Sequence, residues 1–167
     1  LSARNCPDIR DPGTALSACK HLKELDLSCD RISAADQGVT DASIIRLAVQ
    51  RCGTLKVLKL CNAPSLTDAV LVAVAFCKQL TTLNLERCPG IGQQDVGLAA
   101  VAEHCTALKS VELGGCPRVS PAAVRDLAAR MGERMVHLGI DGCATFELRI
   151  ELVKRYHALR GHLDARG

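Results

Sequence analysis

The sequence is poor in aromatic side chains, since its 167 residues include no tryptophan, one tyrosine and two phenylalanines. Its core must therefore be aliphatic, which suits thin, regular layers better than a bulky globular centre. No apolar run reaches the roughly 18 residues of a membrane-spanning helix. With 21 basic and 18 acidic residues, no excess of one charge points to nucleic acid. These absences leave one soluble domain with an aliphatic core.

The short motifs that carry chemistry are absent as well. The sequence contains no GxxxxGK[ST], GxGxxG, HExxH or GxSxG stretch, which excludes the common phosphate-binding, dinucleotide-binding, zinc-protease and hydrolase patterns. Of the five histidines, only His137 falls on an outward strand position. We expect a protein without catalytic activity, cofactor or metal, and nucleic acid is not an expected partner.

What the sequence does contain is a repeated leucine frame, L-x-x-L-x-L. Its copies begin at Leu22, Leu55, Leu80, Leu108 and Met135, at steps of 33, 25, 28 and 27 residues. A leucine-rich repeat has a period of about 20–29 residues, so only the first step is long. The sequence therefore predicts a stack of similar units.

Each frame is followed by the same succession of local signals. The L-x-L alternation predicts a short strand, and Pro or Gly then marks a turn, as in CPGI and CPRV. Helix starts follow at Thr40, Thr67, Asp95, Ser120 and Thr145, where Ser, Thr and Asp can cap free amides. The helices are expected at 42–52, 69–77, 96–105 and 122–132. This order predicts an α/β solenoid, with short parallel strands on a concave face and helices on a convex face.

The unit C-x-x-L-x-x-L-x-L-x-x-C-P-x-[IV] followed by a capped helix resembles the cysteine-containing leucine-rich repeats. That subtype occurs in F-box proteins with leucine-rich repeats and in proteins like the antagonists of the mitotic exit network. The match has departures: Cys29 falls one place early, Ala63 replaces the second cysteine of its unit, and Gly132 replaces a leading cysteine. No F-box-like pattern occurs, so the resemblance does not bring an F-box onto this segment.

We divide the chain as one solenoid over 1–167. It comprises a partial repeat at 1–18, repeats at 19–51, 52–76, 77–104, 105–131 and 132–145, and a C-terminal helix and tail at 146–167. Because Leu1 stands inside a repeat, we expect a segment of a longer protein. An insertion at 30–38 offers a second surface, although a neutral solvated loop is the simpler interpretation.

The ten cysteines form two columns along the stack. Cys19, Cys52, Cys77 and Cys105 precede the frames, whereas Cys6, Cys88, Cys116 and Cys143 close the strand turns. A line of thiols spaced about 4.8 Å apart cannot surround one zinc ion. Disulfides are harder to exclude. We expect small buried side chains whose S–H groups donate to loop carbonyls, in an intracellular, cytoplasmic protein, with an organelle or axoneme left open. Cys61 points outward, where modification is an alternative.

The strand positions between the leucines form the candidate binding site. We select Glu24, Asp26, Lys59, Asn84, Glu86, Glu112, His137 and Asp141, which hold five acids and one lysine. Solenoids bind extended partners on such faces, so this face predicts a basic or mixed-charge protein ligand. The alternative is that a solvated face simply needs polar residues.

The C-terminal helix carries Phe146, Ile150, Val153 and Tyr156 at helical spacing. We expect these four side chains to pack on the last repeat as a cap. Arg149, Lys154, Arg155, Arg160 and Arg166 would then face outward. A basic docking helix is the alternative.

Two settings suit a protein-interaction module of this kind. The F-box resemblance implies the substrate-recognition arm of a ubiquitin ligase, with an F-box in a preceding region. The alternative is a structural subunit of an axonemal, mitochondrial or ribonucleoprotein assembly. An enzyme ranks third, because no motif supports it.

Overall fold

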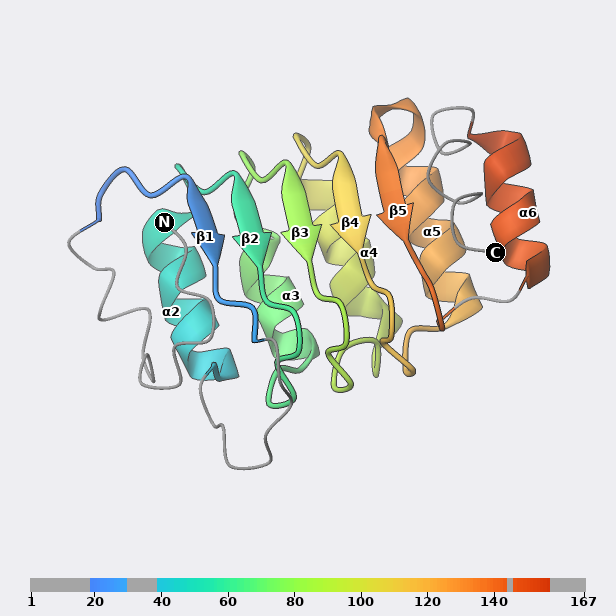
Figure 1. Cartoon of the computed structure of the whole chain (residues 1–167). Helices are drawn as coiled ribbons and strands as arrows, with labels where there is room; N and C mark the ends of the chain where they lie inside the picture. The colour runs from blue at the N-terminus through green and yellow to red at the C-terminus, as the bar shows by residue number, and fades with distance from the viewer. Residues whose placement is uncertain (1–18, 30–38, 144–145, 157–167) are drawn as a thin grey trace.

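The computed structural model describes residues 19–29, 39–143 and 146–156. Within them, five strands form one parallel sheet in the order β1-β2-β3-β4-β5 (Figure 1). The strands are β1 (Glu24–Asp26), β2 (Val57–Lys59), β3 (Thr82–Asn84), β4 (Ser110–Glu112) and β5 (His137–Gly139). The helices are α2 (Asp41–Arg51), α3 (Asp68–Val74), α4 (Asp95–His104), α5 (Pro121–Met131) and α6 (Phe146–Arg155), with a 3-10 turn at Gly132–Arg134. The predicted α/β solenoid is confirmed.

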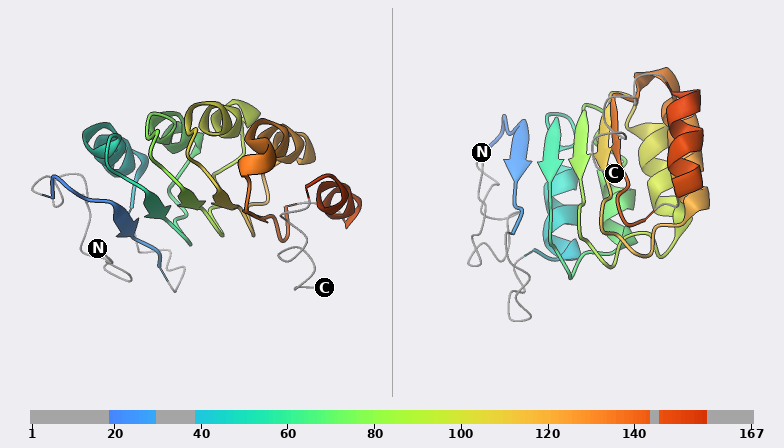
Figure 2. Two further views of the ribbon diagram at one scale, coloured as in Figure 1. Left: turned by 90° about the horizontal axis from the view of Figure 1, so that it is seen from above. Right: turned by 45° about the vertical axis from the view of Figure 1, so that its right-hand side comes forward.

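The described chain is an arc with the sheet on its inner side and the helices on its outer side (Figure 2). The frame leucines explain this layering. Leu58, Leu83 and Val111 lie opposite one another on neighbouring strands and are fully buried. Because side chains alternate along a strand, the residues between them point to the concave face. The leucine frame thus builds the core and the concave face together.

Helix starts follow the predicted capping chemistry at three of four described positions. Thr40, Thr67 and Ser120 are N-caps whose side chains accept backbone N–H groups. The predicted helix start at Asp95 is confirmed, but the expected capping role is wrong, because Gln94 is the N-cap of α4 and makes no side-chain cap bond. Asp95 is instead the first helical residue, and its carboxylate accepts the hydroxyl of Ser120 at 3.1 Å from Oδ1.

That contact belongs to a ladder of aspartates at the first helical position. Asp41 accepts the backbone N–H and the hydroxyl of Thr67, at 2.8 and 2.5 Å. Buried Asp68 accepts the backbone N–H groups of Gly92 and Gln94, at 2.7 and 2.6 Å. Each carboxylate therefore ties the start of its own helix to the turn or helix start of the next repeat.

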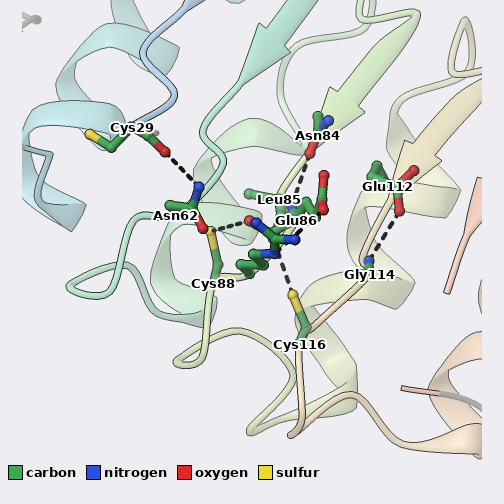
Figure 3. A network of polar contacts seen from close by, with 10 residues as sticks. Cys29, Asn62, Asn84, Leu85, Glu86, Cys88, Glu112, Gly114 and Cys116 are labelled. Carbon is green, nitrogen blue, oxygen red and sulfur yellow. Dashed lines mark hydrogen bonds and ion pairs between the residues drawn. The ribbon is translucent and has the colours of Figure 1, made fainter. Parts of the chain in front are cut away.

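Five thiols behave as the predicted buried donors, whereas the expectation of full burial is wrong for Cys19 and Cys52, which are half-buried like Cys29 and Cys61. Cys77, Cys88, Cys105, Cys116 and Cys143 are buried. Cys88 Sγ donates to the Leu60 carbonyl at 3.1 Å. Cys116 Sγ donates to the Leu85 carbonyl, also at 3.1 Å (Figure 3). Both acceptors lie in the preceding repeat, so these thiols join neighbouring units. All nine described cysteines are free thiols.

The predicted packing of α6 needs correction. Leu148 and Leu152 are buried, Tyr156 is buried and Val153 is partly buried, whereas Ile150 is exposed. The buried stripe follows an i, i+4, i+8 spacing. Arg149 does not face outward, because it pairs with Asp141 at 3.2 Å. The prediction is therefore confirmed for Tyr156 and in part for Val153, and it is wrong for Ile150, while Leu148 and Leu152 are buried residues that the sequence analysis did not select.

Several sequence expectations fall outside the described residues. They are the partial repeat at 1–18 with Cys6, the insertion at 30–38, the helix start at Thr145, and Arg160 and Arg166 in the tail. The side chain of Phe146 is also outside them. In the part of the chain that is described, no helix is long and apolar enough to cross a membrane.

The aspartate ladder makes a prediction at Asp68. In an Asp68→Asn variant, one of the two bonded N–H groups would face an amide NH2 instead of an oxygen. We expect the free energy of unfolding to fall by about 1–3 kcal/mol, as measured by urea denaturation. The matched control is Asp126→Asn on α5, where the exposed carboxylate meets only Arg130 and the change should stay below about 0.5 kcal/mol. Equal losses in the two variants would contradict the ladder.

The thiol of Cys88 predicts a dependence of stability on pH. Burial raises its pKa from 9.0 to about 12, so the unfolded chain loses this proton first. The stabilisation is complete below about pH 9 and is lost as the pH rises towards 12. Between pH 7 and pH 10, wild type should lose about 1.4 kcal/mol more than Cys88→Ala. Urea denaturation with reductant at both pH values measures this difference, and a gap that does not change with pH would contradict the assignment.

Candidate functional site

The concave face is a set of side-chain rows that run across the strands. The first row contains Glu24, Val57, Thr82, Ser110 and His137, and the second contains Asp26, Lys59, Asn84, Glu112 and Gly139. Each row is in register through all five strands. The structure therefore brings the six strand residues of the predicted site onto one surface, as their sequence spacing indicates.

A third row continues just beyond the strands. It contains Ser28, Cys61, Glu86, Gly114 and Asp141. Backbone bonds maintain the register here: Asn62 N–H donates to the Glu86 carbonyl at 2.9 Å, and Gly115 N–H donates to the Asp141 carbonyl. Glu86 and Asp141 thus complete the predicted set of eight on this face. Glu24 is exposed and the other seven are half-buried, so the rows form an accessible but shallow surface.

Much of the polarity in the second row serves the backbone. Asp26 accepts the N–H of Ser28 at 3.1 Å. The Asn84 side chain accepts the backbone N–H of Glu86 at 2.9 Å, and the Glu112 side chain accepts the backbone N–H of Gly114 at 3.1 Å (Figure 3). These bonds satisfy amides at the strand ends. Three of the eight predicted residues therefore have a structural role, which the sequence analysis missed.

Lys59 shows what happens when this position has no acceptor. An ammonium group can only donate hydrogen bonds, so it cannot take the N–H two residues later. The N–H of Cys61 instead donates to Ser28 Oγ of the preceding repeat, at 3.2 Å. Ser28, which makes this contact, is buried. The preceding repeat supplies the acceptor for this N–H, and Lys59 is a positive charge in a row whose other charged residues are Asp26 and Glu112.

The acids of the C-terminal half carry basic neighbours. Glu86 lies 3.6 Å from Arg87, measured between Oε1 and Nε. Glu112 Oε2 lies 3.0 Å from His137 Nε2, and Asp141 pairs with Arg149 of α6. The C-terminal helix thus places a guanidinium beside the last row. The face is of mixed charge, and less acidic than a count of its carboxylates indicates.

Arg87 is held by an unusual turn. Asn62, Arg87, Gly115 and Gly142 occupy the same repeat position and all have positive φ, between 57° and 78°. Two of these positions carry glycine, for which this conformation is unstrained. A Cβ on Gly115 would lie 2.9 Å from Arg87 Cγ, so the absence of a side chain there leaves room for the arginine stem. The turn therefore places a basic group at the edge of the concave face.

The concave face contains no activated nucleophile among its described side chains. Burial raises the pKa of the Cys61 thiol. The hydrogen bond with Ser28 lowers this pKa by less, and the negative charge of Glu86 raises it slightly further. The thiol is therefore protonated at neutral pH. No three His, Cys, Asp or Glu side chains of the described chain gather where they could hold a metal ion.

Comparison with known proteins gives relatives for most of the chain, although no family model matches it. The chain is 29% identical over 140 residues to Antagonist of mitotic exit network protein 1 of Candida glabrata, covering 83% of this chain and 26% of that protein. It is 31% identical to the protein of the same name from Eremothecium gossypii, covering 83% and 33%. F-box/LRR-repeat protein 4 of Bos taurus is 30% identical over 119 residues, covering 59% and 19%. The chain spans a third or less of the length of these relatives.

A solved structure supports the fold independently. The tropomodulin C-terminal domain of Caenorhabditis elegans superposes with a TM-score of 0.64, covering 95% of this chain and 97% of that one, at 16% sequence identity. Identity this low carries the fold alone. Together with the parallel sheet and the sequence relatives, it shows that the chain is a leucine-rich-repeat protein, similar in sequence to part of Antagonist of mitotic exit network protein 1 and of F-box/LRR-repeat protein 4.

Proposed function

We propose that this chain is a non-catalytic module that binds a protein partner across its concave face. The observation that carries the proposal is the in-register set of mixed-charge side chains on the inner side of the arc. Curved solenoids offer such surfaces to extended partners. The partner that fits is basic or of mixed charge, because Glu24 and Asp26 stand at one end while Lys59, Arg87 and Arg149 are interspersed with the remaining acids.

The role that we propose for this module is the substrate-recognition arm of an F-box-type ubiquitin ligase. Support comes from the sequence similarity to F-box/LRR-repeat protein 4, whose name includes F-box. The matched region covers 19% of the length of that protein. The alternative is a structural subunit of a large assembly. The two roles differ in what accompanies the protein, because a ligase arm is associated with a scaffold and adaptor whereas a structural subunit has fixed neighbours.

A charge-reversal experiment tests the concave face. Glu24→Lys with Glu86→Lys reverses two carboxylates of this face and leaves in place Glu112, which accepts the backbone N–H of Gly114. We expect this pair to weaken partner binding about tenfold or more, because complementary charge steers and orients association. The matched control, Glu133→Lys with Glu147→Lys, makes the same charge change at exposed positions outside the three rows.

The measurement is affinity purification of the full-length protein from its native source under reducing conditions, with quantitative mass spectrometry. Loss of partners in the concave pair but not in the control supports the proposed site. Retention of every partner in both variants contradicts it. A cullin-type scaffold with its adaptor indicates the ligase arm, whereas assembly subunits at equal stoichiometry indicate the structural role.

A further inference from the structure

Large apolar side chains gather on the convex face, over α3 and α4. Val72, Phe76 and Val96 are 51%, 67% and 62% exposed. Phe76 is one of two phenylalanines in the chain, yet the core does not use it. A cluster of exposed apolar side chains on a soluble protein marks a contact surface more often than a single one does. Aromatic residues in particular provide much of the binding energy at protein interfaces.

The repeat itself shows that the fold does not require these residues. Counting from each N-cap, Val72 is five residues into its helix, where α5 carries exposed Arg125. Phe76 is nine residues from its N-cap, where α4 carries exposed Glu103. Val96 is at the second helical position, where α3 carries Ala69. At the position of Phe76, α2 carries Val49, which is also exposed. The position therefore accepts a charged or an aliphatic side chain, and the fold requires no aromatic ring there.

The exposed side chains line two hollows that share one residue. One hollow, of about 350 Å³, is lined by Val72, Ala75, Phe76, Lys78, Ala100 and His104. The other, of about 270 Å³, includes Thr67, Val72, Gln94 and Val96. Val72 lines both, so the two hollows are next to each other along the junction of α3 and α4, and we call the pair the groove. These helices lie side by side on the outer side of the arc (Figures 1 and 2).

Both sides of the groove carry apolar residues four positions apart. Val72 lies on α3 and Phe76 lies just beyond its C-cap, Ala75, whereas Val96 and Ala100 both lie on α4. A helix of ten residues such as α4 is about 15 Å long. That length accommodates two to three turns of a third helix, whose apolar residues at i, i+3 or i+4, and i+7 would fit between the ridges.

The charge around the groove is positive at one end. Lys78 and His104 line the larger hollow near the C-terminal ends of the two helices. The acids nearby are already engaged: Arg130 contacts Glu103 at 3.0 Å and Asp126 at 2.7 Å. Asp68 is the one acidic residue among the described residues that line the groove, and both of its carboxylate oxygens already accept backbone N–H groups. An acidic ligand is therefore favoured over a basic one.

We propose that the groove between α3 and α4 is a docking site for an acidic amphipathic helix of a partner protein. Its apolar side chains cover Val72, Phe76 and Val96, and its carboxylates meet Lys78 and His104. The site lies on the face opposite the concave rows and does not depend on the function proposed for them. A protein with both surfaces can hold two partners at once.

The test begins with a display library of random peptides of about 16 residues, which is selected against the wild-type chain. The dissociation constants of the enriched peptides are then measured by fluorescence anisotropy. We expect enriched peptides with apolar residues at helical spacing and a net negative charge. Phe76→Ser should weaken their binding about tenfold or more, and Lys78→Glu should also weaken it. The matched control is Val49→Ser on α2, which removes a 66% exposed apolar side chain and should leave binding unchanged.

Each outcome decides between the docking site and its alternatives. The proposal is overturned if the enriched peptides are basic, if they lack the apolar spacing, or if they bind Phe76→Ser as tightly as wild type. A selection that enriches no peptide also overturns it. A wild-type dimer that Phe76→Ser converts to a monomer in size-exclusion chromatography shows that a second copy occupies the groove, and also overturns it. The variant Glu24→Lys with Glu86→Lys must bind the peptides normally, which separates this site from the concave face.

Discussion

The dependence of every repeat on the next for its hydrogen bonds is the constraint from which the rest of the structure follows. A three-residue strand cannot stand on its own, and each strand here is completed by its neighbours. The aspartates at the helix starts and the thiols at the strand turns make the same connection with side chains. Thr54 and Thr81 add hydroxyl bonds to the carbonyls of Leu22 and Lys56 in the preceding units. Stability in such a stack is a property of interfaces between repeats.

That constraint also explains how much of the fold the sequence predicts. A residue that must meet its counterpart in the next unit recurs at the repeat period, so the leucine frame locates all five strands and the aliphatic core. The thiol columns are predicted for the same reason. The aspartate ladder leaves a comparable signal in Asp41, Asp68 and Asp95, but its role requires the next helix start, which the sequence analysis did not compare.

Contacts that do not recur are the ones that the sequence cannot supply. Arg149 reaches Asp141 from a helix that follows the last repeat, so no neighbouring unit indicates the pairing. The same helix offers two apolar stripes, and only contact with the last repeat selects Leu148 and Leu152 over Ile150. The charge of the concave face was overestimated for this reason, because a count of acids along five strands omits the basic groups that other segments bring to them.

Comparing one position across repeats separates what the fold needs from what it leaves free. On the concave face, Asp26, Asn84 and Glu112 share a backbone acceptor role, so their polarity by itself says little about a partner. Lys59 departs from this role, and a neighbouring serine compensates for it. On the convex face, Phe76 and Glu103 occupy equivalent positions with opposite chemistry, and no local contact accounts for the exposed aromatic ring. An unusual residue such as Phe76, which the packing of the repeats does not require and which no neighbouring residue compensates, is the stronger indication of a binding partner.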